Sequence, residues 1–321
     1  MGKKRIKHLG KKSKRRKIQR LVHISIIVIL IIILCLGVKY LKSMFVSRDI
    51  EDTKIEFYIN IADEIGKDEV QLNWKELLAI DMFVYNNDLS NVKKSDVIHR
   101  GKKFIETYKD KNGNTAYYVK DFNEALNDLG MKKSDKVKIN NYLSQLENVY
   151  LGNRRLNKDS LQIKFISKIK DRAIINYEQF GILPSITIAQ CILESGWGNS
   201  ELSTKGKNLF GIKADSSWEG QSMKLETSEN YDNKSVAEFR VYSSINDSIK
   251  DHGEFLSNNP RYRKNGLFDG KTYILQAQSL EDAGYSTKED ENGNKIYADM
   301  LINLIREYNL QLIDWSLYKK K

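Results

Sequence analysis

The stretch that decides the fold is GILPSITIAQCILESGWGNSELSTKGKNLFGIK, which runs from Gly181 to Lys213. Proline at position 184 is typical of a helix start, because it lacks the amide hydrogen that a first turn leaves unpaired. The apolar positions that follow repeat at helical spacing and predict a buried face, formed by Ile188, Ala189, Ile192 and Leu193. Glu194 ends this run, immediately before the turn Ser195-Gly196-Trp197-Gly198. The sequence therefore predicts a buried helix that ends in a carboxylate.

Glu194 is the first candidate catalytic residue. A carboxyl at the edge of an apolar core is partly desolvated, which raises its pKa and keeps a proton available for a leaving group. Glycoside hydrolysis needs such a general acid. The alternative interpretation is a glutamate at a helix end that only hydrogen-bonds to the turn. The residues alone leave both interpretations open.

A second candidate acid comes from a hairpin that the alternating pattern predicts over residues 223–242. Strand residues two apart share a face, so Glu229 lies on the apolar side with Leu225. Glu226 points the other way, beside Lys224, and is expected to be solvated. A register slip of one residue would exchange the two faces and leave Glu229 an ordinary exposed acid.

Several motifs follow in order across residues 160–314. They are AQCILESGWG at 189–198, NLFGIK at 208–213, FRVY at 239–242, SIKDH at 248–252 and AGYST at 283–287. Together they resemble the N-acetylglucosaminidase domains of glycoside hydrolase family 73, found in flagellar and bacterial cell-wall autolysins. The resemblance implies a lysozyme-like α+β catalytic domain with a small β-hairpin lobe. It also implies an endo-β-N-acetylglucosaminidase that cleaves peptidoglycan glycan strands at the β-1,4 bond between N-acetylglucosamine and N-acetylmuramic acid.

The resemblance also implies roles for individual residues. Glu194 takes the position of the family's general acid, and Thr227-Ser228-Glu229 matches the Thr-x-Glu pattern of its second-acid hairpin. Tyr285 corresponds to a tyrosine in the family's cleft, whose hydroxyl would orient a water or the acetamido group of the substrate. A charged loop at 288–294 departs from the family's pattern before Tyr297, so Tyr285 is the tyrosine carried over.

Substrate-binding residues are expected among the aromatic side chains of the same region. Sugar rings present C–H faces that pack on aromatic planes. We expect some of these side chains to contact glycan and the others to pack in the core. The predicted substrate-binding residues are the aromatic Trp197, Phe210 and Tyr242, together with Asn208.

The positive charge of the chain lies at its N-terminus. The 321 residues carry a net charge of +11, but residues 1–20 hold eleven Lys and Arg and no acid, so 42 charges of each sign remain. The rest of the chain therefore has no overall basic charge with which to bind nucleic acid. Residues 21–38 contain no Asp, Glu, Lys or Arg, and a helix of that length spans ~27 Å, about the thickness of a hydrocarbon core.

We therefore expect a single-pass transmembrane signal anchor at 21–38. Lys and Arg stay on the cytoplasmic side of a span, so the basic tail 1–20 is expected inside and the catalytic domain outside, facing the cell wall. A cleaved signal peptide is the alternative, but its apolar region usually ends at small residues of the A-x-A kind, whereas here Val38 is followed by Lys39-Tyr40-Leu41-Lys42. A buried core helix fits poorly, because only His23 and Ser25 interrupt the apolar run.

Residues 54–151 show helical periodicity and are interpreted as a helical accessory domain, a possible contact for a cell-envelope protein. Asp121 and Ser134 are predicted helix caps. Glu76 and Asp81 lie on a predicted helix and are expected to be solvated acids, without a catalytic role.

No cofactor or metal is expected. Cys35 lies in the predicted membrane span and Cys191 far downstream, so the two are not expected to form a disulfide. The four histidines show no metal-ligand spacing, and no glycine-rich phosphate loop is present. The predicted fold class is mainly α: a transmembrane helix, a helical accessory module and, beyond a polar boundary at 152–159, the catalytic domain. The predicted function is a membrane-anchored peptidoglycan hydrolase for cell-wall remodelling. Two alternatives remain, a catalytically weak wall-binding or scaffold module and a lytic transglycosylase.

Overall fold

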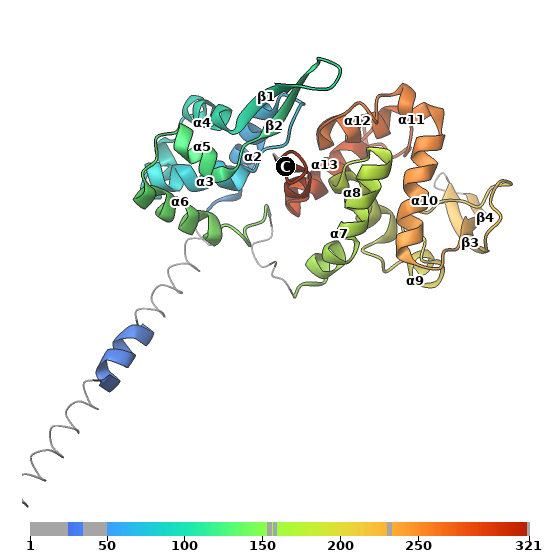
Figure 1. Ribbon diagram of the computed structural model, residues 1–321. Coiled ribbons are helices and arrows are strands. Elements are labelled where there is room, and N and C mark those ends of the chain that lie inside the picture. The colour runs from blue at the N-terminus through green and yellow to red at the C-terminus, as the bar shows by residue number, and fades with distance from the viewer. Residues whose placement is uncertain (1–24, 35–49, 153–155, 157–158, 230–232, 320–321) are drawn as a thin grey trace, which may run out of the picture. The chain divides into compact units, whose positions relative to one another are not determined.

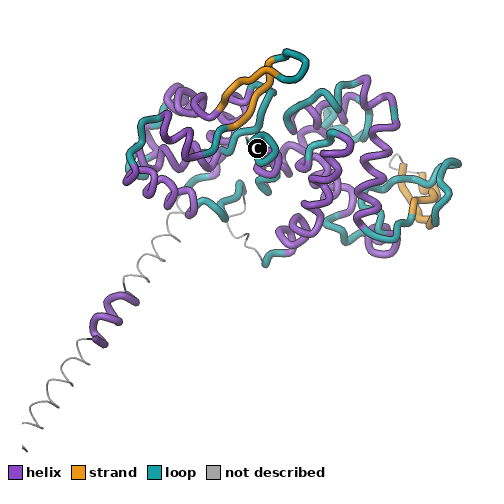
Figure 2. The backbone as a smooth tube through the Cα atoms, viewed as in Figure 1, coloured by secondary structure: helices purple, strands orange, loops and turns teal. Residues whose placement is uncertain are grey.

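The computed structural model describes residues 25–34, 50–152, 156, 159–229 and 233–319 (Figure 1). By internal contacts the chain divides into two units, residues 1–50 and 51–321. Helices make up most of the described chain, and two small antiparallel sheets accompany them (Figure 2). The mainly helical architecture expected from the sequence is confirmed.

In the N-terminal unit the structure describes residues 25–34, which are helical, and Ile50. The other residues of the predicted span 21–38 lie outside the described residues, as does the tail 1–20. Across the described ranges, no helix combines the length and the apolar character needed to cross a bilayer.

The predicted accessory region contains helices and one sheet. Strands β1 (Ile105–Lys109) and β2 (Thr115–Val119) pair antiparallel, and Gly113 turns between them at a φ of 81°, which favours glycine. Asp121 caps a helix as predicted, because its carboxylate accepts the amide hydrogen of Asn123. Ser134 lies inside its helix instead of capping it. The helices are α2 (Asp52–Gly66), α3 (Trp74–Val84), α4 (Lys94–Gly101), α5 (Phe122–Asp128) and α6 (Lys133–Gln145), with 3-10 turns at Leu89–Asn91 and Lys102–Phe104.

The prediction that Glu76 and Asp81 are solvated is wrong. Helix α3 packs against α2, α4 and α6, so it presents no polar face to water, and these acids are 2% and 0% exposed. Asp81 accepts a hydrogen bond of 2.8 Å from the Tyr58 hydroxyl and lies 2.6 Å from a guanidinium nitrogen of Arg100. Burial raises the pKa of Glu76 to about 8, while the positive charge of Lys319 opposes the shift.

The C-terminal region is built around helix α8 (Pro184–Ser195). Every residue of α8 from Pro184 to Ile192 is buried, including the polar Ser185, Thr187 and Gln190. It contacts α7, α12, α13 and α14. The predicted start at Pro184 is confirmed. The helices of this region are α7 (Leu161–Phe180), α8, α9 (Glu201–Gly206), α10 (Ile245–Asn258), α11 (Pro260–Lys264), α12 (Tyr273–Asp282), α13 (Tyr297–Glu307) and α14 (Gln311–Trp315).

The predicted hairpin is present as strands β3 (Ser222–Glu229) and β4 (Asn233–Arg240). They pair antiparallel in a register that sets Met223 opposite Phe239 and Glu229 opposite Asn233. Met223 and Leu225 are half-buried, whereas Lys224 and Glu226 are exposed. The alternation of faces predicted for the first half of the strand is therefore confirmed.

The accessory region packs on the C-terminal region through buried polar contacts. Asp63 of α2 accepts a hydrogen bond of 2.6 Å from the Tyr273 hydroxyl and one of 2.9 Å from the Arg306 guanidinium. The Trp74 indole donates to the Asn309 side chain at 3.1 Å. Because Trp74, Tyr273 and Asn309 are buried and Asp63 and Arg306 are partly buried, separating the two regions would leave polar groups without these partners. The predicted boundary at 152–159 lies partly outside the described residues.

Candidate active site

Glu194 is presented by a sharp turn at the end of α8. Gly196, Trp197 and Gly198 all have positive φ, at 56°, 62° and 74°, a conformation that costs energy for a tryptophan. The Trp197 ring is held by Phe165 and Tyr308, at centroid distances of 6.0 and 4.8 Å. Trp197, a predicted substrate-binding residue, thus has its half-buried ring packed against two core aromatics, where it supports the turn.

Tyr297 is the direct partner of Glu194. Its hydroxyl donates to Glu194 Oε1 at 3.0 Å and accepts from the side chain of Gln190 at 3.1 Å. Gln190 lies one turn before Glu194 on α8, so the two side chains share a face. Sequence reasoning missed both partners, because the loop before Tyr297 obscured its correspondence. The four-residue spacing of Gln190 and Glu194, which places both side chains on one face of a helix, was the signal in the sequence that could have identified Gln190.

The pKa of Glu194 is raised above its ordinary value. Partial burial is the largest cause, and the Tyr297 hydrogen bond and the positive charge of Lys288 act in the opposite direction. The Glu194 side chain still reaches solvent, as a group that transfers a proton to a substrate must. The position therefore combines accessibility with a carboxyl that keeps its proton to higher pH than usual.

A row of aromatic rings runs away from Glu194. Tyr285 stacks on Tyr297 with centroids 5.4 Å apart, and His252 meets Tyr285 edge-on at 6.4 Å. Phe210 stacks on His252 at 3.8 Å. Burial and the nearby charge of Glu194 raise the pKa of Tyr285 well above 10, so its hydroxyl keeps its proton. Burial lowers the pKa of His252 to about 3, which makes it a neutral packing residue.

Asn208 and Phe210, predicted to bind substrate, are buried at 1% and 4% exposure. The Asn208 amide donates to the carbonyl oxygens of Ile212 and Arg240, both at 2.9 Å, and its oxygen accepts from the amides of Phe210 and Ile212. Because these bonds use both ends of the side chain, Asn208 holds the 208–212 loop against the base of the hairpin.

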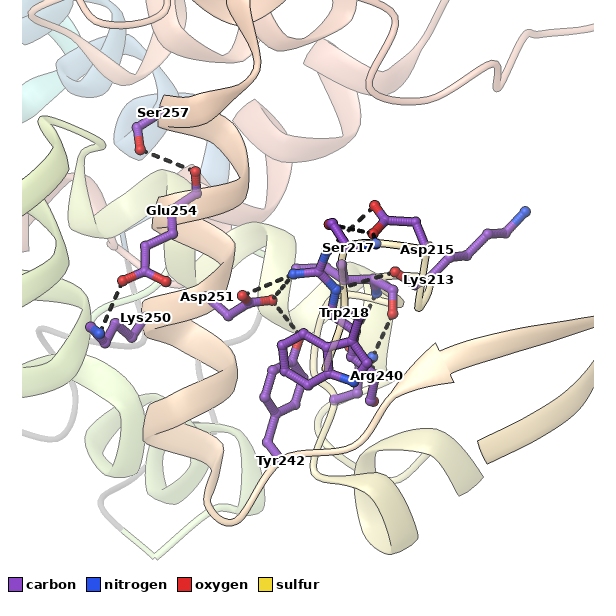
Figure 3. A network of polar contacts seen from close by, with 12 residues as sticks. Lys213, Asp215, Ser217, Trp218, Arg240, Tyr242, Lys250, Asp251, Glu254 and Ser257 are labelled. Carbon is purple, nitrogen blue, oxygen red and sulfur yellow. Dashed lines mark hydrogen bonds and ion pairs between the residues drawn. The ribbon is translucent and has the colours of Figure 1, made fainter. Parts of the chain in front are cut away.

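Tyr242, the last predicted substrate-binding residue, belongs to a network that joins the hairpin to α10 (Figure 3). Arg240 donates two hydrogen bonds of 2.9 Å to the carboxylate of Asp251, and the Tyr242 hydroxyl donates to the same group at 2.6 Å. The Arg240 guanidinium lies 4.7 Å from the ring centroid of Trp218, which meets Tyr242 edge-on. The network sets the position of the strand that pairs with β3.

Glu229 is the last residue of β3. Backbone pairing places it on the same face of the strand as Met223 and Leu225, opposite to Glu226. The side chains of residues 227–235 lie outside the described part of the chain. The role of Glu229 as second acid stays a prediction.

Comparison with known proteins identifies the domain that holds this site. The glucosaminidase family model, described as mannosyl-glycoprotein endo-beta-N-acetylglucosaminidase, matches residues 170–310. Exo-glucosaminidase LytG of Bacillus subtilis is 36% identical over 156 residues, 47% of this chain and 52% of that protein. Peptidoglycan hydrolase FlgJ of Vibrio cholerae is 35% identical over 161 residues, 48% and 45% of the two chains.

A solved structure, the catalytic domain of the autolysin Auto from Listeria monocytogenes, is 32% identical with a TM-score of 0.42, covering 49% of this chain and 90% of that one. The chain spans about half the length of the curated relatives that it matches. The resemblance stated from the sequence motifs is confirmed: residues 170–310 of this chain form a glucosaminidase domain of glycoside hydrolase family 73.

Proposed function

We propose that this protein is a peptidoglycan hydrolase that cleaves glycan strands at the β-1,4 bond on the reducing side of N-acetylglucosamine. The observation that carries the proposal is Glu194, a solvent-reachable carboxyl with a raised pKa at the end of a buried helix. Relatives named as a glucosaminidase and as a peptidoglycan hydrolase support the substrate class.

In the proposed reaction Glu194 donates its proton to the glycosidic oxygen as the bond from that oxygen to the anomeric carbon breaks. The Tyr297 hydroxyl, donating to Oε1, orients the carboxyl, and the oxygen Oε2 carries the proton. The stacked ring of Tyr285 holds Tyr297 in place. General acid catalysis of this kind contributes roughly 10²–10⁴-fold to the rate.

The second carboxylate role falls to Glu229 in this proposal. An acid on the apolar face of β3 would activate the water that attacks the anomeric carbon, or would stabilise the positive charge that develops there. The Arg240–Asp251 pair fixes the base of the hairpin that carries it. The spacing of the two carboxyl groups would decide whether configuration is inverted or retained.

Digestion of purified peptidoglycan tests the activity and the bond cleaved. We expect reducing ends to appear and mass spectrometry to find N-acetylglucosamine at the new reducing end. Glu194→Gln should abolish release, while Glu201→Gln, an exposed glutamate on α9, should leave it unchanged. An anhydro sugar among the products would identify a transglycosylase instead. Co-sedimentation with peptidoglycan without any product would identify a binding module.

The proposal includes endo cleavage, which the description of the matching family model supports. Early in the digestion, chromatography of the released strands should show a fall in mean glycan length with few terminal units set free. Release of single terminal sugars from otherwise long strands would show exo cleavage, the activity in the name of the Bacillus subtilis relative.

We also propose that residues 21–38 anchor the protein in the membrane with the hydrolase domain outside. The absence of Asp, Glu, Lys and Arg from this stretch and the eleven cations before it support the proposal. Protease added to intact, wall-stripped cells should remove residues after about 48 and leave the basic tail protected. A soluble secreted form that begins near residue 40 would contradict the anchor.

A further inference from the structure

A groove of about 1100 Å³ lies on the 51–321 unit, and its lining includes none of the candidate catalytic residues. Both strands of the β1–β2 hairpin form one wall. The end of α7, the segment before α12 and the chain after α14 form the others. The groove is larger than the ~300–1,000 Å³ typical of a small-molecule site, so it can hold an extended oligomer.

The groove is rich in tyrosine. Tyr108 is 50% exposed, and its ring lies 6.0 Å from that of Tyr118. The strand register sets Tyr108 opposite Ala116 and Tyr118 opposite Glu106. Both tyrosine rings therefore lie on one face of the hairpin as diagonal neighbours, and the small Ala116 side chain leaves room between them. The other walls add the rings of Tyr177, Phe268 and Tyr318, and Tyr117 lines the groove from the opposite face of the hairpin. Exposed aromatic planes with hydroxyls at their edges suit the C–H faces and hydroxyl groups of sugars.

The charges around the groove nearly balance. Lys271 forms an ion pair of 2.6 Å with Glu69, and the ammonium of Lys319 lies 4.0 Å from the ring centroid of Trp315. Glu106 accepts a hydrogen bond from the Tyr118 hydroxyl. A site for nucleic acid or another polyanion would need unpaired cations along the backbone path. The described lining instead offers carboxylates and phenols, which exchange hydrogen bonds with neutral sugar hydroxyls.

The walls are joined by hydrogen bonds. The amide of Val119, at the end of β2, donates to the Tyr318 carbonyl at 2.8 Å. The Tyr318 hydroxyl in turn donates to the carbonyl of Lys271. Outside the lining, Asp63 of α2 accepts hydrogen bonds from Arg306 and Tyr273 and so joins the same two regions. A groove held in this way loses little conformational entropy when it is filled, which favours binding.

We propose that this groove is a second glycan-binding site, which takes a β-1,4-linked N-acetylated oligosaccharide on the tyrosine face of the β1–β2 hairpin. The accessory region then contributes to substrate capture, and a strand held there is tethered close to the hydrolase domain of the same molecule. Such tethering raises the effective concentration of glycan without altering the chemistry. The choice of sugar chemistry rests on the function proposed above, whereas the existence of the site rests on the groove.

Titration calorimetry with chitotetraose, four β-1,4-linked N-acetylglucosamine units, tests the proposal. The full chain in detergent carries Glu194→Gln, so that the ligand is not digested. We expect two ligands bound per chain. The double variant Tyr108→Ala, Tyr118→Ala should bind one, because loss of both rings should weaken binding of the ligand in the groove by about tenfold or more. Tyr142→Ala on α6, outside the groove lining, is the matched control and should keep two.

One ligand or none in the parent chain, or two in the double tyrosine variant, overturns the proposal. Thermal unfolding checks that each variant is folded, and Tyr108→Ala alone, at an exposed position, serves if the double variant is not. With Glu194 intact, the double variant should cleave a short soluble oligosaccharide at an unchanged rate, so loss of groove binding and failure of the proposed hydrolase function give different results. A dimer in light scattering without sugar, which the double tyrosine variant converts to a monomer, would also refute the proposal.

Discussion

Asp251→Asn should destabilise the hydrolase domain strongly. The Asp251 carboxylate accepts two hydrogen bonds from Arg240 and one from Tyr242. The side chains of the Arg240–Asp251 pair are only 11% and 15% exposed. Removing this partner leaves a nearly buried guanidinium with only the longer contact of 3.6 Å to Asp215, whose side chain is 60% exposed. The free energy of unfolding should therefore fall by about 3 kcal/mol.

The same helix offers a matched control. Lys250 and Glu254 form an i,i+4 ion pair at 2.9 Å, with side chains 52% and 40% exposed, and Figure 3 shows it beside the Arg240 network. Water screens such a pair, so Glu254→Gln should cost well under ~1 kcal/mol. The two changes on one helix should therefore differ in their effect on stability, because Asp251 is nearly buried and accepts three hydrogen bonds whereas Glu254 forms one exposed ion pair.

Thermal unfolding followed by circular dichroism separates the two outcomes. A loss of ~3 kcal/mol corresponds to a fall in Tm of about 6–12 °C for a domain of this size, whereas the control should move by about 2 °C or less. Asp251→Asn should also slow peptidoglycan hydrolysis, because the strand that pairs with β3 loses its attachment to α10. Equal Tm values for the two variants would refute the argument that the buried pair holds the hairpin.

Other consequences follow from the same contacts. Tyr297→Phe removes a hydrogen bond that lowers the pKa of Glu194, so the alkaline limb of the pH–rate profile, where the acid loses its proton, should move to higher pH; a move to lower pH would contradict the assigned donor direction. Glu229→Gln should reduce hydrolysis far more than Glu226→Gln, and a larger loss from Glu226→Gln would show that the catalytic face of β3 is the other one. Asp63→Asn removes the negative charge from the group that accepts hydrogen bonds from both Tyr273 and Arg306, and limited proteolysis should then separate the accessory region from residues 160–319 faster than in Asp52→Asn, a control at an exposed position of the same helix.

The sequence by itself determined the local elements. The Pro184 start, the apolar run and the glycines at 196 and 198 predicted a buried helix ending in Glu194, because periodicity and turn chemistry are local properties. Alternation likewise predicted the β3–β4 hairpin, including the opposite faces of Leu225 and Glu226. The order of short motifs was enough to indicate the family.

Only the tertiary structure decided which distant groups meet. Tyr297 reaches Glu194 across 103 positions, and Asp63 reaches Arg306 across 243, distances at which no periodicity carries information. The prediction that Glu76 and Asp81 are solvated was wrong for the same reason. Other helices cover α3, and the sequence of α3 does not specify how they pack on it. The pKa of a carboxyl depends on its burial and on the charges and hydrogen-bond donors around it. For Glu194 the sequence predicted a position at the edge of the core, and the packing of α13 against α8 supplied its hydrogen-bond partner.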